Sequence, residues 1–309
     1  MSVRRFVDFH THTTFSDGSF TPEQIIQAAD EAKLAAVAIT DHDTLDAIPS
    51  AKIEALRFPE LTFIPGVEIS AHYTAGAMHI LGLGVDEKNQ KLINLLAEMR
   101  RAREERSPRI IEKLNLAGID ITLAEIYSYA NVALPDSIAR SASENNSLIT
   151  ENLPLRENPA GGVISRVHFA QVLINKGYAK NLKDAFGRYL GKGALAFVEK
   201  DQLKPADVIP VLKQASKIVA LAHPGELRYN NFAHFEEILR TLVDAGLNGI
   251  ECYHSSHTEV HTRKFVDFAQ KYDLFITGGS DFHGLGKPAV QLGKPRTPAS
   301  VVPRDLLNF

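Results

Sequence analysis

The sequence contains little cysteine and no long hydrophobic segment. Its single cysteine, Cys252, excludes a disulfide framework and a metal site built from thiolates. No apolar run reaches the roughly 18 residues that span a membrane, and residues 1–6 lack the apolar core of a signal peptide. We therefore expect a cytoplasmic protein that is not attached to a membrane.

The chain also lacks an excess of charge of one sign. It has 34 lysines and arginines and 37 acidic residues, which give a formal net charge of −3. Such a balance provides no long-range field that would draw nucleic acid to the whole surface. With 44% hydrophobic residues, the 309-residue chain has a globular composition and suits one large domain or one domain with an insertion. Histidine is abundant: the 12 residues are about twice the average usage.

Short apolar runs alternate with amphipathic stretches of helical length, a pattern typical of an α/β fold built from parallel strand–helix units. Thr21 as N-cap and Pro22 in the first turn begin one such helix, which we expect to reach about Leu34. The seven predicted strands are residues 5–10, 36–40, 61–64, 78–83, 218–222, 249–252 and 274–277.

The alternation stops between residues 89 and 204. A polar helix predicted over 89–117 carries five arginines, and its interleaved glutamates favour a solvated face with i,i+4 ion pairs over an RNA-binding stripe. Polar residues 131–162 are too many for an ordinary loop and predict a flexible segment. We expect residues 1–88 and 205–309 to form one catalytic domain, with 89–204 as a mostly helical insertion.

Histidines and acidic residues occur where the predicted strands end. His10 and His12 lie two residues apart in a strand, so their side chains point to the same face. Because the carboxyl ends of the strands of an α/β barrel meet at one face, we expect the polar groups of successive strands to converge. They are His10, His12, Asp41, His42, Asp43, Glu68, His223, Asp281 and His283, together with His79 inside the strand that follows Glu68.

The number of these side chains exceeds what one cation uses, since zinc takes about four ligands and manganese or iron about six. The pattern therefore predicts two or three divalent ions that share a carboxylate. Because the ligands offer nitrogen and oxygen but no sulfur, the ligand types do not decide between manganese, zinc and iron as the bound cation.

In combination, these motifs resemble those of the polymerase and histidinol phosphatase (PHP) domain. The resemblance implies a distorted seven-stranded α/β barrel with a trinuclear metal site that hydrolyses phosphate esters. The motifs are His10-x-His12 with Asp17, Asp41-His42-Asp43, Gly66-Val67-Glu68, His79, His223-Pro224-Gly225 and Ser280-Asp281-x-His283.

The resemblance also assigns the ligands to three ions, with Glu68 shared between two of them. By this assignment, one ion is held by His10, His12, Glu68 and Asp281, a second by Glu68, His79 and His223, and a third by Asp17, His42 and His283.

Residues 164–170 and 189–193 resemble the inserted region of PHP phosphoesterases that act on nucleoside 3′,5′-bisphosphates, whose relatives degrade short RNA from the 5′ end. The resemblance implies that Arg166 and His168 bind a substrate phosphate, with Lys192 as a further phosphate-binding residue. It also implies that His257 contacts the substrate or protonates the leaving group.

The expected function is hydrolysis of a phosphate monoester by a hydroxide that bridges two metal ions, with a nucleoside 3′,5′-bisphosphate such as 3′-phosphoadenosine 5′-phosphate as substrate. An alternative is a 5′→3′ exonuclease on short RNA oligonucleotides. A further alternative is a non-catalytic metal-binding PHP module. The expected partner is a small phosphorylated molecule, and the sequence sets no oligomeric state.

Overall fold

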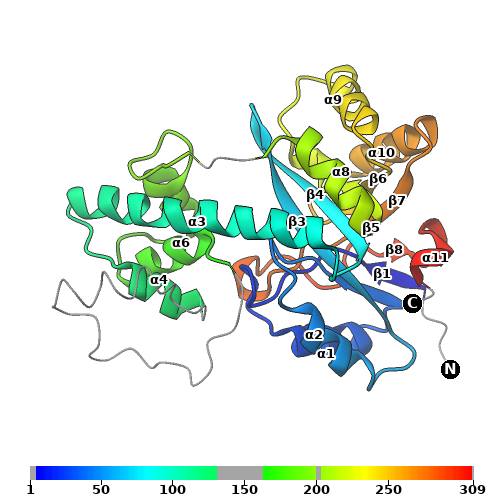
Figure 1. Cartoon of the computed structure of the whole chain (residues 1–309), viewed down its shortest axis with the longest axis horizontal. Coiled ribbons are helices and arrows are strands. Elements are labelled where there is room, and N and C mark those ends of the chain that lie inside the picture. The colour runs from blue at the N-terminus through cyan, green and yellow to red at the C-terminus, as the bar shows by residue number, and fades with distance from the viewer. Residues whose placement is uncertain (1–4, 131–162, 200–202, 308–309) are drawn as a thin grey trace.

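The computed structural model describes residues 5–130, 163–199 and 203–307. Its strands form a single sheet in the order β7-β6-β5-β4-β3-β2-β1-β8 (Figure 1). The strands are β1 (Phe6–Asp8), β2 (Ala36–Ile39), β3 (Thr62–Tyr73), β4 (Gly76–Val85), β5 (Ser216–Leu221), β6 (Gly249–His254), β7 (Phe275–Gly279) and β8 (Thr297–Pro298).

The sheet curves until its first and seventh strands meet. The backbone N–H of Phe9 donates to Gly278 O at 3.0 Å, and the N–H of Asp281 donates to His10 O at 2.8 Å. The approach is close enough that a Cβ atom on Gly279 would lie 2.3 Å from the Cβ of His10. The predicted distorted barrel is therefore confirmed, with one more strand than expected, because the short β8 pairs antiparallel with β1.

The expectation of parallel strands throughout is wrong in the middle of the sheet. Strand β4 runs antiparallel to both β3 and β5, and β3 continues well beyond the predicted 61–64 to Tyr73. Nearly all of β3 is buried, and a strand buried on both faces lacks the alternation that marks an antiparallel strand in a sequence. Strands β3 and β4 form a hairpin, in which Ser70 lies opposite His79.

Helices cover the outside of the barrel, with α1 and α2 on one side of it and α8, α9 and α10 on another (Figure 1). Thr21 caps α1 as expected, and Gln24 completes a capping box, although the helix ends at Glu31 rather than near Leu34. The helices are α1 (Pro22–Glu31), α2 (Ile48–Ala55), α8 (Pro205–Ala215), α9 (Phe232–Asp244), α10 (Glu259–Lys271) and α11 (Arg304–Leu307), with 3-10 turns at Pro224–Glu226, Gly284–Gly286 and Ala299–Val301.

The predicted insertion contains α3 (Gln90–Leu116), which leaves the barrel and extends to one side of it (Figure 1). Beyond the barrel, its second half packs with the other helices of this region around a separate apolar cluster that includes Ile110, Leu114, Phe169 and Leu190. Those other helices are α4 (Leu123–Ala130), α6 (Arg166–Asn175), α7 (Leu182–Ala185) and a π-helical turn (Phe186–Leu190).

The division of the chain at residues 89 and 204 stays a prediction. The polar segment 131–162, predicted to be flexible, lies outside the described residues. Among the described helices, none combines the length and apolar character required to cross a bilayer.

Candidate metal centre and phosphate pocket

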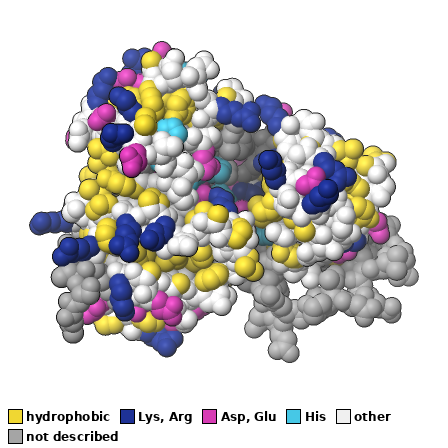
Figure 2. Space-filling view, turned by 180° about the vertical axis from the view of Figure 1, so that it is seen from behind, with side chains coloured by type: hydrophobic (Ala, Val, Ile, Leu, Met, Phe, Trp, Pro, Cys, Tyr) yellow, Lys and Arg dark blue, Asp and Glu magenta, His cyan; other side chains and the backbone are white. Residues whose placement is uncertain are grey.

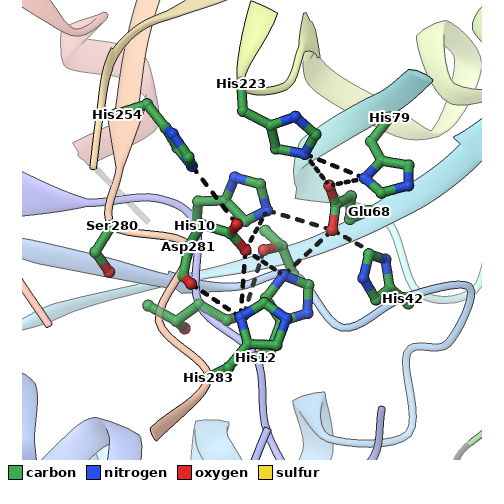
Figure 3. Close-up of polar contacts among 12 residues, drawn as sticks. His10, His12, His42, Glu68, His79, His223, His254, Ser280, Asp281 and His283 are labelled. Atoms are coloured by element: carbon green, nitrogen blue, oxygen red, sulfur yellow. Dashed lines mark hydrogen bonds and ion pairs between the residues drawn. The ribbon is translucent and has the colours of Figure 1, made fainter. Parts of the chain in front are cut away.

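All nine predicted metal ligands lie at one end of the barrel, and Figure 3 labels each of them except Asp17. We call them the histidine–carboxylate cluster. They come from the chain after β1, β2, β5 and β7 and from the middle of β3 and β4, so the fold gathers residues from most of its length. The members are His10, His12, Asp17, His42, Glu68, His79, His223, Asp281 and His283.

Glu68 lies at the centre of the cluster and directs its two oxygens to different neighbours. Oε2 is 3.3 Å from His10 Nε2 and 3.2 Å from His12 Nε2. The same two nitrogens lie 3.6 and 3.3 Å from Asp281 Oδ1. These four side chains are the ones that the resemblance assigned to a first ion.

The other Glu68 oxygen, Oε1, faces a second group. It is 2.8 Å from His79 Nδ1 and 3.0 Å from His223 Nε2, and the two ring nitrogens are 3.1 Å apart. Glu68 therefore belongs to two adjacent groups of potential ligands, which is the arrangement of a carboxylate shared by two cations.

Asp17 forms the third group with two histidines. Its Oδ1 lies 3.2 Å from His283 Nε2, and its Oδ2 lies 3.8 Å from His42 Nε2. His42 also connects this group to the centre, because its Nδ1 is 2.9 Å from Glu68 Oε2.

The donor atoms of the cluster fit divalent cations. Several of them are buried and have no hydrogen-bond partner among the described residues, including His10 Nε2, His12 Nε2, Asp17 Oδ1 and Glu68 Oε2. Leaving such polar atoms buried and unpaired is costly, whereas imidazole nitrogens and carboxylate oxygens are ligands for Zn²⁺, Mn²⁺ and Fe²⁺.

The electrostatics of the cluster also favour a bound cation. Burial would raise the pKa of Glu68, but the charges of His42, His79 and His10 hold it well below its usual range. Burial would lower the pKa of His10, but Glu251 and Glu68 raise it well above its usual value. Without metal, the ionised carboxylates therefore retain protons on neighbouring imidazoles, and a divalent cation would displace those protons.

Other buried carboxylates hold the ligand-bearing segments in place. Glu251 Oε1 lies 3.1 Å from His10 Nδ1, and its Oε2 accepts the backbone N–H of His223 at 2.6 Å. Asp41 Oδ1 accepts the N–H of Thr13 at 2.7 Å. Such contacts orient metal ligands. Glu251 was not among the residues predicted from the sequence, although an acidic residue within an apolar strand is a signal that could have identified it.

A pocket of about 410 Å³ opens beside the cluster. We call it the arginine pocket, because Arg103, Arg106 and Arg166 line it together with Lys192, and His42 and His79 form the wall that it shares with the cluster. Figure 2 shows the hollow on this face, in which histidine and basic side chains gather. The structure therefore brings two of the predicted substrate-binding residues, Arg166 and Lys192, next to the predicted metal ligands.

The prediction that the arginines of this helix lie on a solvated face is wrong for two of them. Arg103 and Arg106 are each only 6% exposed, because α3 lies against the open end of the barrel at this point. Arg103 forms an ion pair with Asp43 and donates from Nη1 to Ile164 O at 3.2 Å. The Nε of Arg106 has no partner among the described residues, and burial together with Arg103 and Arg166 lowers the pKa of its guanidinium.

His168 lies apart from the arginine pocket. Its Nδ1 accepts the N–H of Ser165 at 3.1 Å and so caps α6, and its ring borders a second pocket. Burial lowers the pKa of His168 to about 4, so the ring is neutral near pH 7.

His257 lies outside the histidine–carboxylate cluster. Its Nδ1 is 3.0 Å from Cys252 O, and its Nε2 accepts the N–H of Gly225 at 3.1 Å. Both nitrogens are thus engaged within the chain, and the expected role in catalysis stays a prediction. His254, which the sequence analysis did not assign, is nearer, with Nε2 3.6 Å from Asp281 Oδ2 (Figure 3).

Comparisons with known proteins agree with this geometry. A family model described as the PHP domain matches residues 8–272. The chain is 30% identical over 289 residues to the 5′-3′ exoribonuclease Rnm of Escherichia coli, covering 93% of this chain and 88% of that protein. It is 30% identical over 288 residues to the 3′,5′-nucleoside bisphosphate phosphatase of Chromobacterium violaceum, covering 93% and 90%. The solved structure of an amidohydrolase from Chromobacterium violaceum, with bound sulfate and no metal, has a TM-score of 0.78 at 28% identity and covers 97% of this chain and 95% of that one.

Proposed function

Because the chain belongs to the PHP domain family, we propose that it removes the 3′-phosphate from nucleoside 3′,5′-bisphosphates such as 3′-phosphoadenosine 5′-phosphate. The family makes the chain a metal-dependent phosphoesterase, as the sequence motifs predicted. Our proposal concerns the identity of the substrate. It is supported by the relative named as a 3′,5′-nucleoside bisphosphate phosphatase and by the layout of the site.

The observation that carries this proposal is the arginine pocket beside the histidine–carboxylate cluster. A substrate with two phosphates requires one place where a phosphate reacts and another where a phosphate is bound. The cluster would bind the reacting phosphate, and Arg106 and Arg166 would bind the other, since a guanidinium keeps its charge and donates in a fork that matches phosphate oxygens. An anion there would also relieve the mutual repulsion of the guanidinium groups.

We propose that the cluster holds two or three divalent ions, of manganese, zinc or iron, in the three groups described above. Ions bound there would supply an activated water and would neutralise charge on the reacting phosphate. Glu68, which contacts members of two groups, would keep neighbouring ions at a fixed separation. All nine positions carry residues able to bind a cation, which argues against a non-catalytic module.

The protein's own groups would orient the substrate. Arg106 and Arg166 would fix the phosphate that does not react, and Lys192 at the exposed rim would add a mobile positive charge. His168 lies apart from these groups, with its Nδ1 accepting from Ser165, so its contact with a substrate phosphate stays a prediction. The contribution of His257 and the cytoplasmic location remain expectations from the sequence.

Release of inorganic phosphate tests the proposal. The purified protein, loaded in turn with Mn²⁺, Zn²⁺ or Fe²⁺, would be assayed on 3′-phosphoadenosine 5′-phosphate, on 5′-AMP and on 3′-AMP. We expect the bisphosphate to have the highest kcat/KM, and a chelator to abolish turnover. Equal turnover of the bisphosphate and 3′-AMP would contradict a role for the second phosphate, and no turnover with any metal would refute the proposal.

The exonuclease alternative is favoured by the name of the Escherichia coli relative and by a second pocket, of about 740 Å³, which meets the arginine pocket at Asp17 and Val167.

A further inference from the structure

We propose that a pocket at the other end of the barrel from the histidine–carboxylate cluster binds a small molecule with two or more phosphate groups, such as a nucleoside diphosphate. We call it the basic pocket, after the four basic side chains that line it, Arg5, Lys33, Lys294 and Arg296. Its volume is about 610 Å³, within the ~300–1,000 Å³ usual for sites that bind small molecules. The proposal does not depend on the substrate proposed for the metal centre.

The basic pocket lies where the first two strands begin. Arg5 and Phe6 stand at the start of β1, and Leu34 precedes β2, which runs parallel to β1. The predicted metal ligands His10 and His42 follow the ends of the same two strands. Among the described residues, none lines both the basic pocket and either of the two pockets beside the cluster. A ligand bound there would therefore be separate from the metal centre.

The charge of the basic pocket favours an anion with several negative charges. None of the described residues that line it is acidic. Lys33 Nζ is 3.8 Å from Asp30 Oδ2, and within the described part of the chain no other ion pair involves the four basic side chains. A hollow lined by charge of one sign attracts ligands of the opposite sign, and a multiply charged anion would reduce the repulsion between these cations.

Two features of the wall suit a phosphorylated organic molecule. The Cζ atom of Arg296 lies 5.1 Å from the centroid of the Phe6 ring. A guanidinium that packs against a ring keeps its N–H groups available at its edges, where they can donate to phosphate oxygens in pairs. Leu34 and Leu292 add an apolar part to the same wall, which a nucleoside attached to the phosphates could contact.

A buried carboxylate fixes the backbone beside the basic pocket. Asp8 is fully buried, and its Oδ2 accepts the N–H of Gly293 at 2.7 Å and the hydroxyl of Ser280 at 2.6 Å. Gly293 lines the pocket directly before Lys294. The segment that carries Lys294 and Arg296 is therefore anchored before a ligand arrives, which lowers the entropic cost of binding.

Isothermal titration calorimetry of the whole protein with ADP, in the presence of a chelator, tests the proposal. We expect Lys294→Gln/Arg296→Gln to raise the Kd about 100-fold, or about tenfold for each lost hydrogen bond to a charged group. The matched control Arg263→Gln/Lys264→Gln removes the same two charges from exposed positions of α10 and should keep the wild-type Kd. An unchanged Kd in the pocket variant, or an equal rise in the control, would overturn the proposal.

Two further measurements locate the bound ADP. Arg106→Gln, which weakens the arginine pocket, should leave this Kd unchanged, and an equal loss of binding there would overturn the proposal. Because the chain contains no tryptophan, Phe6→Trp places a single fluorescent reporter in the basic pocket. In a Phe6→Trp protein whose circular dichroism matches the wild type, ADP should change the emission with the Kd found by calorimetry. Unchanged emission at saturating ADP would also overturn the proposal.

A comparison with inorganic pyrophosphate shows where the phosphate groups come from. Tighter binding of ADP than of pyrophosphate would support a nucleotide whose nucleoside contacts Leu34 and Leu292. Equal binding of the two would support a small polyphosphate that needs no nucleoside. If single-stranded DNA bound more tightly than either, and Lys294→Gln/Arg296→Gln weakened that binding, the basic pocket would belong to a nucleic-acid surface and the proposal would be wrong.

Discussion

Glu68 is the residue on which the arrangement of the cluster depends most. Its Oε1 faces His79 and His223, its Oε2 faces three other histidines, and the side chain is 1% exposed. Among the described residues, Glu68 directly contacts members of all three ligand groups, including His42 of the third, so no neighbouring side chain could take over its position.

Replacing Glu68 with glutamine should remove the shared ligand while keeping its shape. We expect Glu68→Gln to bind at least one metal ion fewer per chain by atomic emission spectrometry. Its kcat should fall by more than the ~100-fold typical of groups that only orient ligands. The control Glu236→Gln changes a surface carboxylate that pairs with Lys271 and should keep full metal content. Normal metal content in Glu68→Gln would contradict the assignment.

A substitution at Arg106 tests whether the arginine pocket binds a substrate phosphate. A hydrogen bond to a charged group contributes ~1.5–3 kcal/mol, so Arg106→Gln should raise KM for the bisphosphate by about tenfold to 100-fold. The effect on 3′-AMP, which lacks the second phosphate, should be smaller. Arg109→Gln, an exposed residue one turn along the same helix, is the matched control. Equal KM values for the two variants would show that Arg106 does not contact substrate.

His168 should make the free energy of unfolding depend on pH. Its pKa is about 4 in the folded protein, and ~6.5 is usual for an exposed histidine. Because the unfolded chain then binds the proton more tightly, the stabilisation is fully present above about pH 6.5 and is lost as the pH falls toward about 4.

Urea denaturation at two pH values measures this effect. Between about pH 7 and about pH 5.5, wild type should lose about 1 kcal/mol more than His168→Gln, whose amide oxygen can still accept from Ser165. The exposed His72→Gln should behave as wild type. Equal losses in wild type and His168→Gln would mean that the ring is not buried in its neutral form.

The sequence predicted the residues of the cluster and two of those that line the arginine pocket, Arg166 and Lys192, but it did not predict Arg103 and Arg106. His10, Glu68 and Asp281 stand in short motifs at strand ends, where residue type and position along the strand suffice to suggest a ligand. Arg103 and Arg106 stand in a run of charged residues, and only the packing of α3 against the barrel decides which of its faces is buried. That packing is a long-range property that a local pattern does not contain.

At the scale of elements, the close contact between β1 and β7 positions two ligand segments at once. Gly279 approaches the backbone of His10 so closely that any Cβ atom would overlap it. The glycine thereby sets the distance between the segment that carries His10 and His12 and the segment that carries Asp281 and His283.

Gly279→Ala should therefore disturb both stability and metal binding. We expect the free energy of unfolding to fall by ~1–3 kcal/mol, the usual effect of overpacking, and the metal content to fall with it. In Gly187→Ala, the control, the added methyl group meets nothing within 4 Å. Thermal denaturation and metal analysis measure the two effects, and a Gly279→Ala protein with unchanged metal content would show that this contact does not set the ligand geometry.

The positions of helices and strands were easier to predict than the relative directions of the strands. The long helix expected over 89–117 is α3, Gln90–Leu116, because Asn89 caps it and its pattern is local. The reversal at the β3–β4 hairpin was missed, since both strands are apolar on both faces and the turn after Tyr73 lacks a distinctive signal. Strand pairing is decided by contacts that the sequence pattern does not specify.

At the scale of the whole molecule, the ligands come from segments that are adjacent only in the folded chain. Cations should therefore bind the folded state and stabilise it. At a free Mn²⁺ or Zn²⁺ concentration ~1,000-fold above Kd, the gain is ~4 kcal/mol. We expect the Tm to fall by several degrees when a chelator is added, and the fall to be smaller for Glu68→Gln. The same Tm with and without chelator would contradict a preformed metal centre.

The ligand segments come from opposite ends of the chain, which has a consequence during synthesis. His10 and His12 leave the ribosome early, but their partners Asp281 and His283 are translated almost last. A nascent or prematurely terminated chain therefore lacks a competent centre, and the complete set of ligands exists only after translation has passed residue 283.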